Sequence, residues 1–207
     1  FLTGTRADFG KIKSLIEKLL GDDQFEVFVC ATGMHLNRNY GYTIAEIEKC
    51  GYPNISSFEN HKGNESMDNI LANTIKGFSE VVKKEQPDLI VVHGDRVEAL
   101  AGAIVGAMNN ILVGHIEGGE VSGTIDELVR HAVSKMSHCH FVANKNARQR
   151  LLQMGEDENC VFEIGSPDID VMLSEKLPNV EEVKEYYEIP FDDFGIVMFH
   201  PVTTELE

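Results

Sequence analysis

The chain has 207 residues, 43% of them hydrophobic, which suffices for one domain with a substantial buried core. Its formal net charge of −16 argues against nucleic acid and against an anionic membrane as partners, because both attract positively charged surfaces. We find no apolar run long enough to span a bilayer and no signal peptide, and we expect a cytoplasmic protein.

Expected strands and helices alternate along the chain, which is typical of a doubly wound α/β fold with a parallel sheet. The sequence Gly165-Ser166-Pro167 breaks this pattern, and a polar, acidic stretch then leads to a strand that begins a second unit. The chain opens on the end of one strand and stops just after another, so we expect a partial chain. Strands are expected at residues 1–3, 25–31, 55–58, 89–92, 111–114, 141–143, 161–164 and 196–199. Helices are expected at residues 9–20, 44–50, 66–85, 97–108, 126–137 and 145–154.

Two of the expected strands end in a histidine followed by a carboxylate. The strand from Leu89 leads into His93-Gly94-Asp95-Arg96, and the strand from Ile111 leads into His115-Ile116-Glu117. The stretch between them has the length of a crossover helix, which makes the two strands parallel neighbours. Ligands of such sheets bind beyond the carboxyl ends of the strands. Asp95 and Glu117 are therefore candidates for acid–base chemistry on one small substrate, while helix capping is the alternative for Asp95.

Further polar residues fall on the same expected edge of the sheet. Arg6 lies in a glycine-bounded turn before the first helix, where backbone N–H groups favour an anion; a plain turn with a solvated arginine is an equal alternative. Asp126 lies at the start of a later helix, where capping explains it as well as catalysis does. His35 and His200 each follow a strand, and either suits phosphate binding or proton transfer.

The cysteines and the paired histidines do not indicate a metal site. His138 and His140 alternate around Cys139, but no further ligands are near them in the sequence, so we favour a structural role. The cysteines lack a C-x-x-C pair, which fits reduced cytosolic thiols. They are Cys30, Cys50, Cys139 and Cys160.

Four segments together resemble the hydrolysing UDP-N-acetylglucosamine 2-epimerases, in the branch that makes N-acetylmannosamine for sialic acid. They are, in chain order, Gly4–Gly10, His93–Arg96, His115–Asp126 and Phe199–Thr204. The resemblance runs essentially from end to end, and the run from Glu117 to Asp126 is its most specific part. That run points to this branch and not to relatives that release UDP-N-acetylmannosamine.

The resemblance implies a glycosyltransferase-B fold, with the substrate between two Rossmann-like domains. Residues 1–167 would be the first domain, and 168–207 the connection and the first strand of an incomplete second one. In the family, many of the contacts that bind uridine and diphosphate come from later segments of the chain. We therefore expect this stretch alone to be inactive. UDP-GlcNAc and UDP are the implied ligands of a homo-oligomer, a dimer or a tetramer, with no cofactor and no metal.

The implied reaction inverts C2 of UDP-GlcNAc with net hydrolysis. UDP departs, a C2 proton is removed to give a glycal, and water then adds with the new proton on the opposite face. Glu117 and Asp126 would act at C2 and Asp95 would assist elimination, with crowding raising the pKa of at least one of them. His200, Arg6 and Arg96 would stabilise the leaving diphosphate. The residues expected to contact the substrate are Arg6, Asp8, His35, Arg96, Gly118 and Gly119.

Three alternatives stay open. A related epimerase could act on a GDP-linked or 2,4-diacetamido sugar nucleotide. A glycosyltransferase of the same fold would need fewer acids around C2. A nucleotide-sugar-binding module without catalysis is the third, and the presence of Asp95, Glu117 and Asp126 argues against it.

Overall fold

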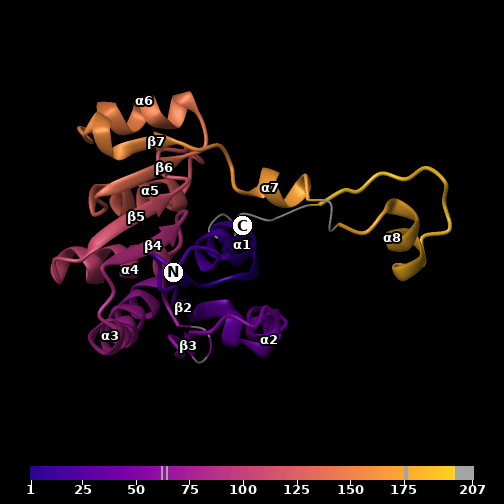
Figure 1. The fold of residues 1–207 in the computed structure, drawn as a ribbon, viewed down its shortest axis with the longest axis horizontal. Helices are drawn as coiled ribbons and strands as arrows, with labels where there is room; N and C mark the ends of the chain where they lie inside the picture. Colours follow the sequence, from indigo (N-terminus) through magenta and orange to yellow (C-terminus); the bar gives the residue numbers. More distant parts are fainter. Residues whose placement is uncertain (62, 64, 175–176, 199–207) are drawn as a thin grey trace. The chain divides into compact units, whose positions relative to one another are not determined.

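The computed structural model describes residues 1–61, 63, 65–174 and 177–198, and it divides into two compact units, Phe1–Leu173 and Ser174–Glu207. The first unit is an α/β domain, and the second contains helix α8 (Val180–Tyr186) (Figure 1). The first unit extends past the expected boundary at residue 167, because helix α7 (Asp168–Met172) packs against helix α1 (Arg6–Leu20).

The strands of the first unit pair in parallel, in two sheets that lie edge to edge through β1 and β4. The strand order along the domain is therefore β3-β2-β1-β4-β5-β6-β7. The chain builds outward from β1 in one direction and from β4 in the other, so the order reverses between these two strands. Ligands of such folds bind at this switch point, beyond the carboxyl ends of the strands. The strands are β1 (Leu2–Thr3), β2 (Val29–Ala31), β3 (Ile55–Ser57), β4 (Leu89–His93), β5 (Leu112–Ile116), β6 (Cys139–Val142) and β7 (Val161–Glu163).

Helices cover both faces of the sheet, which confirms the doubly wound architecture (Figure 1). On one face, apolar side chains of α3 (Met67–Glu85), α4 (Val97–Met108) and α5 (Ile125–Lys135) pack against β4 and β5. On the other, α1 and α2 (Ile44–Lys49) bury their isoleucines against β2. Helix α6 (Lys145–Gln153) packs against β6 and β7.

Helix α4 approaches the sheet closely because two glycines face it. A Cβ atom added at Gly102 would lie 2.6 Å from Val92 Cγ1, and one at Gly106 would lie 2.3 Å from Val113 Cγ2. Real side chains do not reach such distances, so the helix sits nearer to β4 and β5 than a helix with larger residues there could. This packing sets the position of the first turn of α4 at the switch point.

Several element boundaries differ from the expected ones for identifiable reasons. Helix α1 begins at Arg6, earlier than the expected residue 9, because Thr5 and Asp8 form a reciprocal capping box. The expected strand 25–31 pairs from Val29 onward, and Phe25 is 52% exposed. Helix α7 was not expected. The sequence Gly165-Ser166-Pro167 breaks the alternation before it.

The expected strand at residues 196–199 is wrong for the part that the structure describes. Residues 196–198 form no strand, and Val197 is 95% exposed. A strand needs a neighbour to satisfy its backbone N–H and C=O groups. Among the described residues of the second unit there is no such neighbour. Phe199 lies outside the described residues.

None of the described helices combines the length and the apolar character needed to cross a membrane. The cysteines of the chain are free thiols.

The close approach of α4 predicts that Gly106→Ala lowers the free energy of unfolding by about 1–3 kcal/mol, the usual effect of overpacking a core. Gly10→Ala is the matched control, since a Cβ at this helical glycine of α1 meets nothing within 4 Å. That variant should be neutral or more stable by up to about 1 kcal/mol. Urea denaturation measures both, and equal stability of the two variants would contradict the packing account.

Candidate active site

Glu117 lies at the carboxyl end of β5 in a strained backbone conformation. Its φ is +58°, in the left-handed region that residues other than glycine rarely adopt. Its backbone N–H donates to Phe141 O at 2.9 Å. Strain of this kind persists where the surrounding structure fixes it and is common at functional sites. The turn directs the Glu117 carboxylate toward side chains from other elements.

Three side chains donate to the Glu117 carboxylate. Lys11 Nζ of α1 lies 2.7 Å from Oε2, His93 Nε2 of β4 lies 3.1 Å from Oε2, and Ser166 Oγ donates to Oε1 at 2.7 Å. The Glu117 side chain is 12% exposed, and the His93 side chain is 9% exposed. The first helix, the fourth strand and the segment after β7 therefore meet at one carboxylate.

These contacts control the ionisation of Glu117. Burial alone would raise the pKa of Glu117, but hydrogen bonds from His93, Lys11 and Ser166 outweigh burial and lower the pKa to about 2. Crowded carboxylates were expected to raise the pKa of at least one catalytic acid, and for Glu117 the shift is in the opposite direction. At neutral pH Glu117 is an ionised carboxylate that can accept a proton.

Lys11 joins Glu117 to the segment that follows the sheet. Its Nζ lies 3.3 Å from Asp168 Oδ2 at the start of α7. Burial by itself would lower the pKa of Lys11, but the carboxylates of Glu117 and Asp168 outweigh it and raise the pKa. The ammonium is therefore charged at neutral pH and fixes α7 near the carboxyl edge of the sheet.

Asp95 lies beyond the end of β4 and pairs with Arg130 of α5. The Arg130 side chain is 14% exposed, and its buried Nε has no hydrogen-bond partner among the described residues. Burial lowers the pKa of Arg130. Asp126 is exposed one turn earlier on α5, and residues four apart share a helix face. Asp126 and Arg130, the partner of Asp95, therefore lie on the same face of α5.

His115 ties the loop that carries Asp95 to β5 and α5. Its Nε2 lies 2.8 Å from Gly94 O and its Nδ1 lies 3.0 Å from Ser134 Oγ. The ring is fully buried, and desolvation lowers the pKa of His115 to about 3, so the ring is neutral. Its contribution is to fix the turn after β4.

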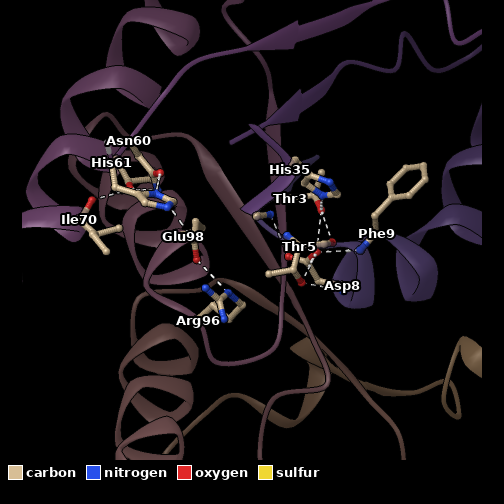
Figure 2. A network of polar contacts seen from close by, with 12 residues as sticks. Thr3, Thr5, Asp8, Phe9, His35, Asn60, His61, Ile70, Arg96 and Glu98 are labelled. Atoms are coloured by element: carbon tan, nitrogen blue, oxygen red, sulfur yellow. Dashed lines mark hydrogen bonds and ion pairs between the residues drawn. The ribbon is translucent and has the colours of Figure 1, made fainter. Parts of the chain in front are cut away.

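Asp8 and His35, both expected to contact the substrate, lie in a buried network of hydrogen bonds (Figure 2). Asp8 accepts hydrogen bonds from Gly4 N at 3.0 Å, Thr5 N at 2.8 Å and Thr3 Oγ1 at 2.8 Å. His35 is 0% exposed between Thr3 Oγ1 at 3.0 Å and Thr43 Oγ1 at 2.8 Å. Burial lowers the pKa of His35. These contacts make both residues supports of the turn after β1, and their expected substrate contacts stay a prediction.

Gly118 and Gly119 are also buried, and they allow close packing of the loop after Glu117. A Cβ at Gly118 would lie 2.8 Å from His115 Nδ1, and one at Gly119 would lie 2.5 Å from Ala147 O. Arg150 donates to Gly119 O. The structure therefore explains these glycines by packing, and their expected substrate contacts stay a prediction.

The remaining expected residues have distinct surroundings. Arg6 is exposed at the first turn of α1, and Arg96 follows β4 and pairs with Glu98. His200 lies outside the described residues.

His138 is exposed and accepts from Val113 N at 3.1 Å, while buried His140 contacts Glu156 at 3.1 Å, in line with the structural role that we favoured. Within the described ranges, no group of His, Cys, Asp or Glu side chains could hold a metal ion.

Sequence reasoning gave no role to Lys11, His93, Ser166 or Arg130. His93 begins the first motif, and its place before Asp95 was a usable signal. Lys11 is 106 residues from Glu117 in the sequence, and Ser166 is 49 residues away, so local patterns contain no trace of these contacts. Ser166 was interpreted only as part of a break between elements.

Comparison with known proteins shows the family of this chain. The family model described as UDP-N-acetylglucosamine 2-epimerase matches residues 17–207. The chain belongs to this family. It is 50% identical over 204 residues to a UDP-N-acetylglucosamine 2-epimerase of Neisseria meningitidis, covering 99% of this chain and 54% of that protein. It is 38% identical over 213 residues to a UDP-N,N'-diacetylbacillosamine 2-epimerase (hydrolyzing) of Legionella pneumophila, covering 100% of this chain and 56% of that one.

A crystal structure of UDP-GlcNAc 2-epimerase from Neisseria meningitidis bound to UDP-GlcNAc superposes with a TM-score of 0.80 at 24% identity. The match covers 92% of this chain and 52% of that one, and it supports the glycosyltransferase-B type of fold with the second domain partly present. The chain spans about half the length of the curated relatives that it matches.

The contacts of Glu117 predict the effect of removing one donor. In Lys11→Met, the pKa of Glu117 should rise from about 2 toward the ordinary glutamate value of about 4.3, because an ammonium and its hydrogen bond are lost. The stability that this lowered pKa contributes is complete above the ordinary value and is lost as the pH falls toward 2. The titration is followed by carboxyl ¹³C NMR of labelled protein.

Lys13→Met is the control, because Lys13 lies on the same helix and pairs with the half-exposed Glu17 at 3.8 Å. It should leave the titration of Glu117 unchanged. An unshifted Glu117 in Lys11→Met would contradict the account.

Proposed function

We propose that the full-length protein is a hydrolysing UDP-N-acetylglucosamine 2-epimerase that converts UDP-GlcNAc and water to N-acetylmannosamine and UDP, for sialic acid synthesis. The observation that supports this most is the ionised Glu117 carboxylate at the carboxyl edge of the sheet, close to the switch point. It is held by Lys11, His93 and Ser166, and a second carboxylate, Asp95, follows the neighbouring strand β4 and pairs with Arg130. Membership of the epimerase family fits this chemistry.

The reaction begins with cleavage of the bond between C1 and the diphosphate oxygen. The bonding electrons leave with UDP, and positive charge develops at C1 and the ring oxygen. A fixed carboxylate stabilises such a charge without rearranging, and Asp95 has this role because Arg130 holds it in place. Arg6 and Arg96 at the same edge of the sheet bind the diphosphate.

A base then removes the proton from C2, and the electrons of the C–H bond form the C1–C2 double bond of a glycal. Glu117 is the proposed base, because its carboxylate is ionised at neutral pH. A carboxylate with a pKa of about 2 is a weak base, so this step depends on the positive charge at C1, which acidifies the C2 proton. Water adds to C1 while a second acid delivers a proton to the opposite face of C2, which inverts that centre. Asp126, exposed on α5 one turn before Arg130, is the proposed second group.

Incubation of the full-length protein with UDP-GlcNAc in deuterated water tests the function. We expect free N-acetylmannosamine with deuterium at C2, together with UDP. A product without deuterium, or transfer of the sugar to an acceptor, overturns the proposal. Release of UDP-N-acetylmannosamine would retain epimerisation and overturn the hydrolytic part.

A 2,4-diacetamido sugar nucleotide is the second candidate substrate, because the Legionella relative is named for such an epimerase. Product analysis by NMR with both nucleotide sugars separates the two. The one with the higher kcat/KM is the substrate, and preference for the diacetamido sugar would overturn the assignment to UDP-GlcNAc.

The mechanism predicts that Glu117→Gln in the full-length protein lowers kcat by about 10²- to 10⁴-fold, the usual contribution of an acid–base group. UDP affinity should stay nearly unchanged, because Glu117 acts at the sugar. Initial rates and UDP titrations measure the two effects. Glu163→Gln, at an exposed position of β7, is the control and should keep full activity. Wild-type turnover in Glu117→Gln would remove Glu117 from the mechanism.

A further inference from the structure

Glu98 is a buried carboxylate that the reaction above does not use. It lies in the first turn of α4 and is 2% exposed. A carboxylate without water is stable only beside donors or a positive charge, so its partners define its role. Figure 2 shows Glu98 between the turn after β1 and a polar cluster from the segment before α3.

Each carboxylate oxygen of Glu98 has a different donor. Asn60 Nδ2 lies 3.4 Å from Oε1, and Arg96 Nε donates to Oε2 at 3.1 Å. Asn60 is itself 2% exposed, and its amide also donates to Thr74 Oγ1 of α3 at 2.9 Å. The orientation of Glu98 is thus fixed from the side opposite to Arg96.

The backbone is shaped around this side chain. A Cβ at Gly4 would lie 2.7 Å from Glu98 Cδ, and one at Gly33, whose φ is +62°, would lie 2.5 Å from Oε1. Gly4 follows β1 and Gly33 follows β2, so the Glu98 side chain fills the space between the carboxyl ends of these strands. It lies at the switch point, where β1 meets β4.

Arg96 is the part of this arrangement that reaches solvent. Its side chain is 37% exposed while that of Glu98 is 3% exposed. A guanidinium carries several N–H donors in a planar fork, and the Nε contact with Glu98 uses one side of that fork. The other N–H donors of the fork are not used by this contact. Arg96 follows β4, and Arg6 lies in the first turn of α1 after the neighbouring strand β1.

We propose that Glu98 is a positioning residue that holds the Arg96 guanidinium in place for the diphosphate of the nucleotide sugar. An unheld arginine samples many rotamers and loses that freedom when it binds, whereas the Glu98 contact orders it beforehand. The inference rests on the proposed function, since it assigns the ligand of Arg96. The alternative is that Glu98 only connects the strand ends and contributes nothing to nucleotide binding.

A glutamine at position 98 separates these possibilities with little change in volume. Both partners of Glu98 are donors, and a carboxylate offers an acceptor oxygen to each. Glutamine offers one acceptor oxygen, so its amide group would face a donor on the other side. Glu98→Gln therefore loosens Arg96 or Asn60 while the space between Gly4 and Gly33 stays filled.

The experiment is a double-mutant cycle on UDP affinity in the full-length protein, measured by calorimetry, with Glu98→Gln, Arg96→Ala and the double variant. If Glu98 acts through Arg96, Glu98→Gln weakens UDP binding by about 5- to 30-fold, as expected for weakening a hydrogen bond to a charged group. In the Arg96→Ala background the same change has no further effect. Equal effects in both backgrounds, or unchanged UDP affinity in both Glu98→Gln and Glu98→Asp, overturn the inference.

Glu156→Gln is the matched control, because Glu156 is another shielded glutamate, with Lys135 at 2.7 Å and His140 at 3.1 Å, and takes no part in the site. Its UDP affinity should equal that of the unaltered protein. If Glu98→Gln does not fold, Glu98→Asp takes its place in the cycle, since it keeps the charge and withdraws the carboxylate from Arg96.

The outcomes also distinguish this inference from the proposed function. UDP binding without release of N-acetylmannosamine by the unaltered protein overturns the function alone. If the unaltered protein releases N-acetylmannosamine but the effects of Glu98→Gln and Arg96→Ala on UDP affinity are additive, only the positioning role is overturned. Absence of UDP binding overturns both.

Discussion

A carboxylate withdrawn from water requires donors, and acidic side chains at the carboxyl edge of this sheet meet that requirement in different ways. Asp8 accepts from backbone N–H groups and threonine hydroxyls, which fixes the turn after β1. Glu98 faces an amide and a guanidinium, Asp95 a guanidinium, and Glu117 an ammonium, an imidazole and a hydroxyl. The donors of these acids come from different loops, which are thereby tied together at this edge.

The strand order explains how residues distant in sequence supply these donors. The chain leaves β1 toward β2 and β3 and returns to β4 beside β1, so the first and fourth strands end at the same place. Helix α1 thereby brings Lys11 to Glu117, and the segment after β7 brings Ser166. The fold joins the beginning and the end of the first unit at one carboxylate.

The sequence was sufficient for the regular parts of this structure. Helix α4 has the bounds expected for the crossover, 97–108, because apolar runs and Ala/Gly composition are local properties. The placement of Asp95 and Glu117 beyond parallel strands also followed from the alternation. The donors could not be predicted, since Lys11 and Ser166 meet Glu117 only after folding. The pKa of Glu117 is lowered, whereas we expected crowding to raise the pKa of at least one acid. The reason is the same: the sequence shows how many acids there are, but not which donors face them after folding.

The fit between Glu98 and its surroundings has a consequence for how the sequence can vary. Alanine at Gly4 or Gly33 would overlap the Glu98 side chain, and a shorter acid at position 98 would leave a void between the strand ends. Gly102 and Gly106 add to this, because they let α4 lie low enough for its first turn to reach that space. These positions constitute an epistatic block. We expect a single substitution within it to be destabilising, and a second, compensating replacement to restore part of the lost stability.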